Sequence, residues 1–163
     1  MLGLTSMGVV HTAISLVALV SGFWALGRYR FITANNGLGK VYLVSTALTA
    51  ATGLFIFQHG GFGPPHALSI MTLLALALGA VASRTGMFGK WWRYVEALAH
   101  TTTVFFHMIP GFTETLTRLP LGAPVLPNAD APQFGPIYGA LFLLLIGGLV
   151  LQFRWLKSSS AAP

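Results

Sequence analysis

Five long apolar runs dominate the pattern of hydrophobic and polar positions along the chain. Each run is close to the roughly 20 residues of helix that cross a hydrocarbon core of about 30 Å. Segments rich in glycine, proline and basic residues separate the runs and break helices. The sequence therefore predicts an all-α integral membrane bundle of about five transmembrane helices, with spans at about 7–27, 40–58, 66–83, 91–110 and 136–156.

Composition agrees with lipid as the main partner of the chain. Of the 163 residues, 55% are hydrophobic and only 7% are charged, too few to cover a water-facing surface. The net charge of +6 lies in short loops between apolar runs, which is a topology pattern and not that of a nucleic-acid-binding face. Cysteine is absent, which excludes disulfides and thiolate sites. We expect one transmembrane domain over 1–157 and a disordered tail over 158–163.

Basic residues and tryptophans both indicate which way the helices cross. With five spans, Arg118 is the only lysine or arginine on one side of the membrane. The other side holds Arg28, Arg30, Lys40, Arg84, Lys90, Arg93, Arg154 and Lys157. Cytoplasmic loops are enriched in lysine and arginine, so we expect the N-terminus outside and the C-terminus in the cytoplasm. At that same cytoplasmic interface fall Trp24, Trp91, Trp92 and Trp155. The first run lacks the flanks of a cleaved signal peptide, so we expect a retained first helix. From the small size and the charge bias we expect a bacterial inner membrane.

Five histidines are the most informative residues chemically, because imidazole is costly in hydrocarbon and often binds metal or haem or transfers protons. His11 begins the first predicted helix, and His107 ends the fourth. His59 and His66 flank the loop between the second and third helices. We expect these four at the outer membrane face and His100 deeper, near the middle of the membrane.

The fourth predicted helix carries an ionisable face. Glu96, His100, Thr103 and His107 follow a spacing of four, three and four residues, which places them on one side of a helix. Glu96 is the only acidic residue within the predicted spans, so it should face the bundle interior. Two other helices offer matching polar or small faces, formed by His11, Ser15, Ala18 and Gly22 and by Ser45, Thr49, Thr52 and His59. Beyond Pro110 the helix can continue, with Glu114 and Arg118 spaced as an i,i+4 pair.

These residue types permit three kinds of site. A copper, zinc or iron centre needs three or four converging ligands, which His11, His66 and His107 could supply. Haem b needs axial imidazoles from facing helices, and candidates to bind such a cofactor are His11, His66, His100 and His107. A proton relay would use Glu96 and His100 without a metal.

Three short patterns resemble a group of uncharacterised bacterial multi-pass membrane proteins, labelled as a domain of unknown function. They are His11 opening a helix, the step Gly37-Leu38-Gly39-Lys40-Val41-Tyr42, and the aromatic-basic segment Lys90-Trp91-Trp92-Arg93-Tyr94. The resemblance covers about the first two-thirds of the chain. It implies a helical bundle and no particular activity, so function has to be argued from the site.

Three functions follow as hypotheses. The first is a membrane protein that binds haem b or a transition metal through outer-half histidines, for electron transfer or redox chemistry. The second is a non-catalytic accessory subunit that packs against other membrane subunits through its small-residue faces. The third is proton-coupled transport. Whether the chain is an enzyme is left open, although no hydrolase elbow, HExxH pair or phosphate loop is present.

Overall fold

The computed structural model describes residues 5–57 and 61–159. This part of the chain is all-helical and contains no strand. In chain order the elements are α1 (Ser6–Tyr29), α2 (Gly37–Gly53), α3 (Pro64–Thr85), the 3-10 helix η1 (Gly89–Trp91), α4 (Trp92–Arg118) and α5 (Phe134–Ser159). The predicted all-α fold is confirmed.

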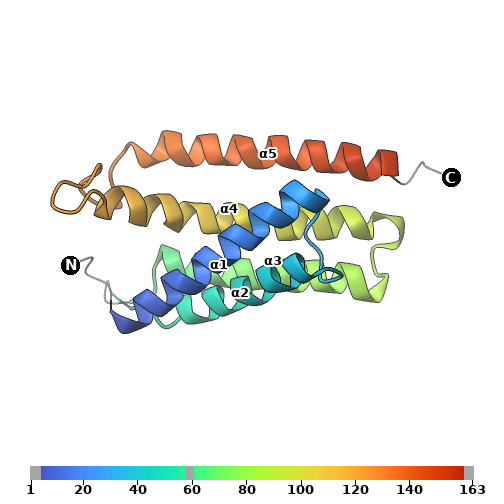
Figure 1. The fold of residues 1–163 in the computed structure, drawn as a ribbon, viewed down its shortest axis with the longest axis horizontal. Helices are drawn as coiled ribbons and strands as arrows, with labels where there is room; N and C mark the ends of the chain where they lie inside the picture. Colours follow the sequence, from blue (N-terminus) through green and yellow to red (C-terminus); the bar gives the residue numbers. More distant parts are fainter. Residues whose placement is uncertain (1–4, 58–60, 160–163) are drawn as a thin grey trace.

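Successive α-helices run up and down the long axis of the molecule (Figure 1). Helices α1 to α4 pack together, and α5 lies along the far side of α4. Helix α1 begins at one end of the molecule, and α5 ends at the opposite end. The core of this arrangement is therefore α1 to α4, with α5 attached to its outside.

Local sequence signals set the helix ends. The Thr5 hydroxyl accepts a hydrogen bond from Gly8 N–H at 3.1 Å, and the Asn36 side chain accepts one from Gly39 N–H at 2.8 Å. Helix α3 starts with two prolines. Proline lacks an N–H group, and this costs no hydrogen bond here because N–H groups in the first turn of a helix have no intrahelical acceptor. Gly86 ends α3 with φ of 67°, a left-handed conformation that glycine adopts without strain.

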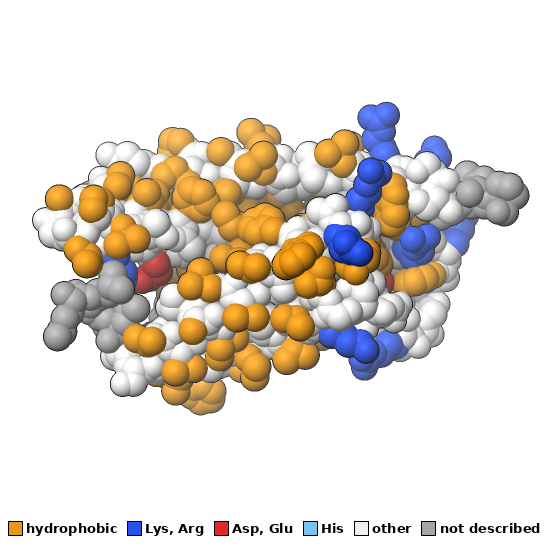
Figure 2. All heavy atoms as spheres, in the orientation of Figure 1, with side chains coloured by type: hydrophobic (Ala, Val, Ile, Leu, Met, Phe, Trp, Pro, Cys, Tyr) orange, Lys and Arg blue, Asp and Glu red, His pale blue; other side chains and the backbone are white. Residues whose placement is uncertain are grey.

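Three of these helices, α1, α3 and α5, are long and apolar enough to cross a membrane. Large apolar side chains cover the outside of the molecule along its length (Figure 2). Polar side chains are instead found inside, and the buried ones include Thr46, Thr103, Glu96, His100 and His107. This inverted distribution supports a membrane protein, because lipid favours an apolar exterior and forces polar groups inward.

Two helices differ from the predicted spans. Helix α2 ends at Gly53 and not at 58, since the next three residues tighten into a turn with hydrogen bonds from Leu54, Phe55 and Ile56 N–H to the carbonyls three residues earlier. Helix α4 runs through Pro110 to Arg118, and Arg118 pairs with Glu114. The predicted extension and its ion pair are thus confirmed.

Helix α5 extends beyond the boundary that the sequence predicts between the transmembrane domain and its tail. It includes Ser158 and Ser159, which the sequence predicts to lie in a disordered tail. Both hydroxyls donate to the Trp155 carbonyl, at 2.8 and 2.9 Å, and so cover the last turn of the helix. Residues 160–163 lie outside the described part of the chain.

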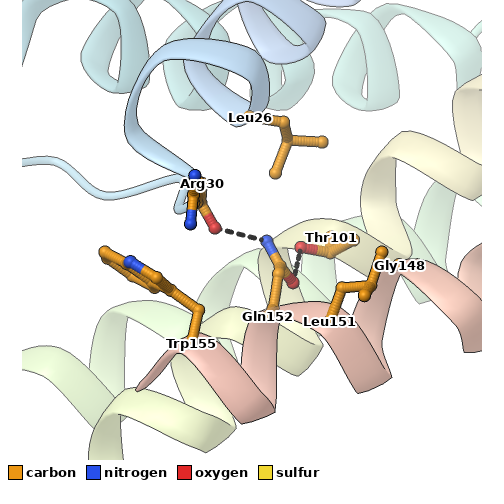
Figure 3. A pocket seen from close by; sticks show the side chains of 7 residues that line it. All are labelled: Leu26, Arg30, Thr101, Gly148, Leu151, Gln152 and Trp155. Atoms are coloured by element: carbon orange, nitrogen blue, oxygen red, sulfur yellow. Dashed lines mark hydrogen bonds between the residues drawn. The ribbon is translucent and has the colours of Figure 1, made fainter. Parts of the chain in front are cut away.

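One buried side chain ties α5 to the rest of the molecule. Gln152 Nε2 donates to the Arg30 carbonyl at the end of α1, at 3.0 Å, and Gln152 Oε1 accepts from the Thr101 hydroxyl of α4 at 2.8 Å (Figure 3). Leu156 and Phe153 of α5 add apolar contacts with the cluster around Ala97 of α4.

Candidate functional site

The ionisable face of α4 points into the bundle. Glu96, His100, Thr103 and His107 are all buried, with Glu96 only 1% exposed. The prediction that Glu96 faces the interior is therefore confirmed. Because an isolated charge in an apolar interior is strongly disfavoured, the groups around these four residues decide what the face can do.

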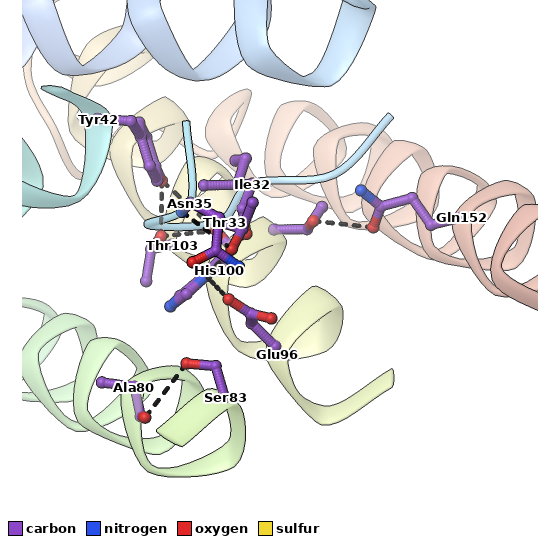
Figure 4. A network of polar contacts seen from close by, with 11 residues as sticks. Ile32, Thr33, Asn35, Tyr42, Ala80, Ser83, Glu96, His100, Thr103 and Gln152 are labelled. Atoms are coloured by element: carbon purple, nitrogen blue, oxygen red, sulfur yellow. Dashed lines mark hydrogen bonds and ion pairs between the residues drawn. The ribbon is translucent and has the colours of Figure 1, made fainter. Parts of the chain in front are cut away.

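At the end of this face nearest the N-terminus of α4, Glu96 and His100 form a buried pair. Glu96 Oε1 lies 3.9 Å from His100 Nδ1, an ion-pair distance and not a hydrogen bond (Figure 4). Neither carboxyl oxygen has a hydrogen-bond partner. Thr33 and Arg93 lie within interaction range of this carboxyl, but Thr33 does not reach hydrogen-bond geometry. Glu96 is therefore a buried acid with His100 beside it and no hydrogen-bond partner.

The backbone between α1 and α2 fixes the protonation pattern of His100. Its Nδ1 lies 3.0 Å from the Ile32 carbonyl. A carbonyl oxygen can only accept, so Nδ1 must carry the hydrogen. A neutral His100 then keeps its lone pair on Nε2, and a charged His100 can pair with ionised Glu96. Transfer of the Glu96 proton to His100 Nε2 thus converts the pair from a neutral form to an ionic form without changing its total charge.

Gly79 of α3 makes room for the imidazole of His100. A Cβ atom at position 79 would overlap His100 Nε2. Helix α3 can therefore approach α4 only where it carries no side chain. Sequence reasoning missed this contact, and a glycine in the middle of a long apolar helix was the available signal.

The middle of the face continues through hydroxyl groups of α2. Thr103 Oγ1 donates to the His100 carbonyl at 2.7 Å, so it accepts from Tyr42 Oη at 2.6 Å. Thr46, one turn further along α2, places its hydroxyl 3.1 Å from His107 Nε2. The rings of Tyr42 and His107 meet edge to face, with centroids 6.3 Å apart. Tyr42 and Thr46 were not predicted as site residues.

At the opposite end of the face, towards the C-terminus of α4, side chains of α1 and α2 continue the polar contacts. His11 Nδ1 lies 3.0 Å from Thr52 Oγ1, and the Ser15 hydroxyl donates to Thr49 Oγ1 at 3.4 Å. The predicted matching faces of these two helices thus meet. His11 is half-buried and within electrostatic range of His107 and Glu114. We call the set from Glu96 and His100 through Thr103, Tyr42, Thr46 and His107 to His11 the polar file.

His66 lies apart from the contacts of the polar file. It begins α3, and its ring packs on Phe57 and Phe62, with centroid distances of 4.6 and 5.4 Å. Its Nδ1 accepts from Gly63 N–H at 3.2 Å, and its buried Nε2 has no partner. His59 lies outside the described residues.

The predicted three-ligand metal set is not assembled. Among the described residues, no three histidine, aspartate or glutamate side chains are placed to hold one metal ion. His11 and His107 approach each other across α1 and α4, whereas His66 sits in its aromatic contact. Helical spacing could not reveal the ring contacts that His66 makes with Phe57 and Phe62.

No family model, curated protein or solved structure matches this chain. The suspected family therefore stays a prediction. The polar file itself supplies acids, bases and hydroxyls that can exchange protons.

Proposed function

We propose that the polar file carries protons through the bundle and that the chain is a small proton-linked membrane protein. The observation that carries this proposal is the buried Glu96 carboxyl, which has no hydrogen-bond partner and faces His100 at 3.9 Å. A buried acid of this kind is costly to keep, and intramembrane acids next to histidine are characteristic of proton relays.

The order of groups supports stepwise transfer. A proton enters at Glu96, near Arg93, and passes to Nε2 of His100, because Nδ1 already carries the hydrogen that bonds the Ile32 carbonyl. A ring rotation or a water molecule has to bridge this step, since Glu96 faces Nδ1. Hydroxyl groups of Thr103, Tyr42 and Thr46 can each donate and accept, and they extend towards His107. His107 interacts with the half-buried His11 at the other end. The His100 backbone carbonyl, which accepts from Thr103, has no proton to pass on. A water molecule or a side-chain reorientation therefore has to connect the His100 ring with the Thr103 hydroxyl.

We further propose that all five α-helices span a bacterial inner membrane, with the N-terminus outside and the C-terminus in the cytoplasm. The end of the molecule that holds most lysines and arginines would then face the cytoplasm (Figure 2). Helix α2, with 17 residues, extends roughly 26 Å at about 1.5 Å per residue, slightly short of a hydrocarbon core. Helix α4 is less apolar, but its polar face is buried by α2 and α3 and needs no lipid contact.

Proton flux into proteoliposomes tests the proposal. Purified protein is reconstituted with a pH-sensitive dye inside, and a potassium diffusion potential drives protons inward. Wild-type vesicles should acidify faster than empty ones, and Glu96→Gln should return to the empty-vesicle rate because the amide cannot release a proton. Asp130→Asn, at an exposed acid of the outer loop, is the matched control and should conduct as wild type. Equal flux in wild-type and Glu96→Gln vesicles would refute the relay.

A second candidate function is a haem b or transition-metal centre for electron transfer. The proximity of His11 and His107, which come from α1 and α4, favours this candidate. Each histidine contacts a threonine hydroxyl through one ring nitrogen, so the other ring nitrogen could act as a ligand. Two axial imidazoles are what a six-coordinate haem takes. An optical spectrum of purified protein, oxidised and then dithionite-reduced, decides this candidate together with metal analysis. A Soret band and a reduced α-band that vanish in His107→Ala would support it, and colourless, metal-free folded protein would remove it.

A further inference from the structure

A groove opens on the outside of the molecule between the end of α1, α4 and α5. Its volume is about 420 Å³. Leu26, Gly148 and Leu151 form its walls, and Arg30 and Trp155 lie at one end (Figure 3). None of the residues that line it belongs to the polar file, so it is a separate site.

The floor of the groove already has its polar groups paired. Gln152 donates to the Arg30 carbonyl and accepts from Thr101, as described above. An occupant therefore gains most by contact with the apolar walls. Gly148 widens this space, because a Cβ atom built on it meets nothing within 4 Å. The groove is thus shaped for a slender apolar chain.

The end of the groove is basic and aromatic. The Arg30 side chain is exposed, and the Arg93 guanidinium lies 6.0 Å from the centre of the Trp155 ring. Lysines and arginines gather at this end of the molecule (Figure 2). Tryptophan and arginine at the end of a membrane helix mark the level of lipid headgroups.

We propose that this groove binds one anionic phospholipid, with its phosphate at Arg30 and an acyl chain along Leu26, Gly148 and Leu151. From Gly148 to Trp155 the helix rises roughly 10 Å at about 1.5 Å per residue, which lies within one leaflet of a hydrocarbon core about 30 Å thick. The bound lipid fills the space between α1 and α5. The proposal requires headgroups at the basic end of the molecule and does not depend on proton conduction.

Native mass spectrometry tests this site. The protein is purified in a mild detergent and titrated with phosphatidylglycerol or phosphatidylcholine. We expect one phosphatidylglycerol adduct that survives removal of the detergent, and weaker binding of phosphatidylcholine. Arg30→Gln should weaken the adduct about fivefold, the effect of the roughly 1 kcal/mol that one basic residue contributes near an anionic surface. Gly148→Leu should abolish it by filling the groove.

Two controls separate the groove from general attraction. Arg84→Gln removes a basic residue at the end of α3 that does not line the groove, and Gly139→Leu adds the same side chain elsewhere on α5, where a Cβ also meets nothing within 4 Å. Both should keep the adduct. Equal loss in Arg84→Gln, retention in Gly148→Leu with wild-type circular dichroism, or a dimer in place of a lipid adduct would each overturn the proposal.

Discussion

Helices α4 and α5 have nearly the same length, 27 and 26 residues, and lie side by side, yet they face opposite surroundings. Helix α4 lies between α3 and α5 and buries Glu96, His100 and His107. Helix α5 exposes large apolar side chains such as Leu143 and Leu144, 70% and 72% exposed. Of these two helices, only α5 is apolar enough along its length to be recognised as a membrane span. Hydropathy therefore reports contact with lipid, and a helix shielded by its neighbours can carry the chemistry.

The same contrast distinguishes the packing of the two regions. Within α1 to α4, glycines allow close contact with side chains or backbone, as at Gly39 and Gly79. On α5, Gly139 and Gly147 have free space where a Cβ would lie. Small residues in membrane helices favour close helix contacts. Some glycines of α1 to α4 make such contacts, whereas others, such as Gly27 and Gly111, and the glycines of α5 do not.

The largest expected difference comes from adding one methyl group in each region. A Cβ at Gly39 would overlap the Thr33 carbonyl, and backbone cannot move aside as a flexible side chain can. Gly39→Ala should therefore destabilise the protein by about 3 kcal/mol, the upper end of ordinary overpacking. Gly147→Ala should be neutral or stabilise by up to about 1 kcal/mol through helix propensity. Unfolding by SDS in mixed micelles, followed by circular dichroism, measures both, and similar values would contradict the contrast.

A smaller difference is expected from removing a hydroxyl in each region. Tyr42 Oη lies 2.6 Å from Thr103 inside the bundle, and Tyr138 Oη lies 2.6 Å from Thr113 between α4 and α5. Tyr42→Phe should lose about 1.5 kcal/mol, because Tyr42 is fully buried and its partner loses a donor. Tyr138→Phe should lose about 0.6 kcal/mol or less, since Tyr138 is half-buried. The same unfolding assay applies, and a larger loss for Tyr138→Phe would reverse the comparison.

The features of this structure that depend on a single helix could be predicted from the sequence. The helices, the inward face of α4 and its extension to Arg118 follow from hydropathy and from a period of 3.6 residues. The prediction that His11, Ser15, Thr49 and Thr52 share an interior also follows from helix faces, and their hydrogen bonds confirm it.

Contacts between helices were not predictable in the same way. The pairing of Tyr42 with Thr103 and of Thr46 with His107 depends on how α2 is rotated against α4, and one sequence carries no record of that rotation. The Ile32 carbonyl that orients His100 comes from a loop, whose course is set by tertiary packing. His66 was grouped with His11 and His107 for the same reason, although it packs on Phe57 and Phe62.

The smallest expected effect concerns the attachment of α5. Gln152→Met removes the hydrogen bonds to Arg30 and Thr101 but keeps a side chain of similar length. Polar contacts between membrane helices contribute about 0.6 kcal/mol on average, so global stability should fall by about that amount. Amide hydrogen exchange should increase mainly in α5, because α1 to α4 pack without it. Gln133→Met, at an exposed glutamine of the loop between α4 and α5, is the control and should change neither quantity. Faster exchange across α1 to α4 in Gln152→Met would show that α5 belongs to the same cooperative unit as the bundle.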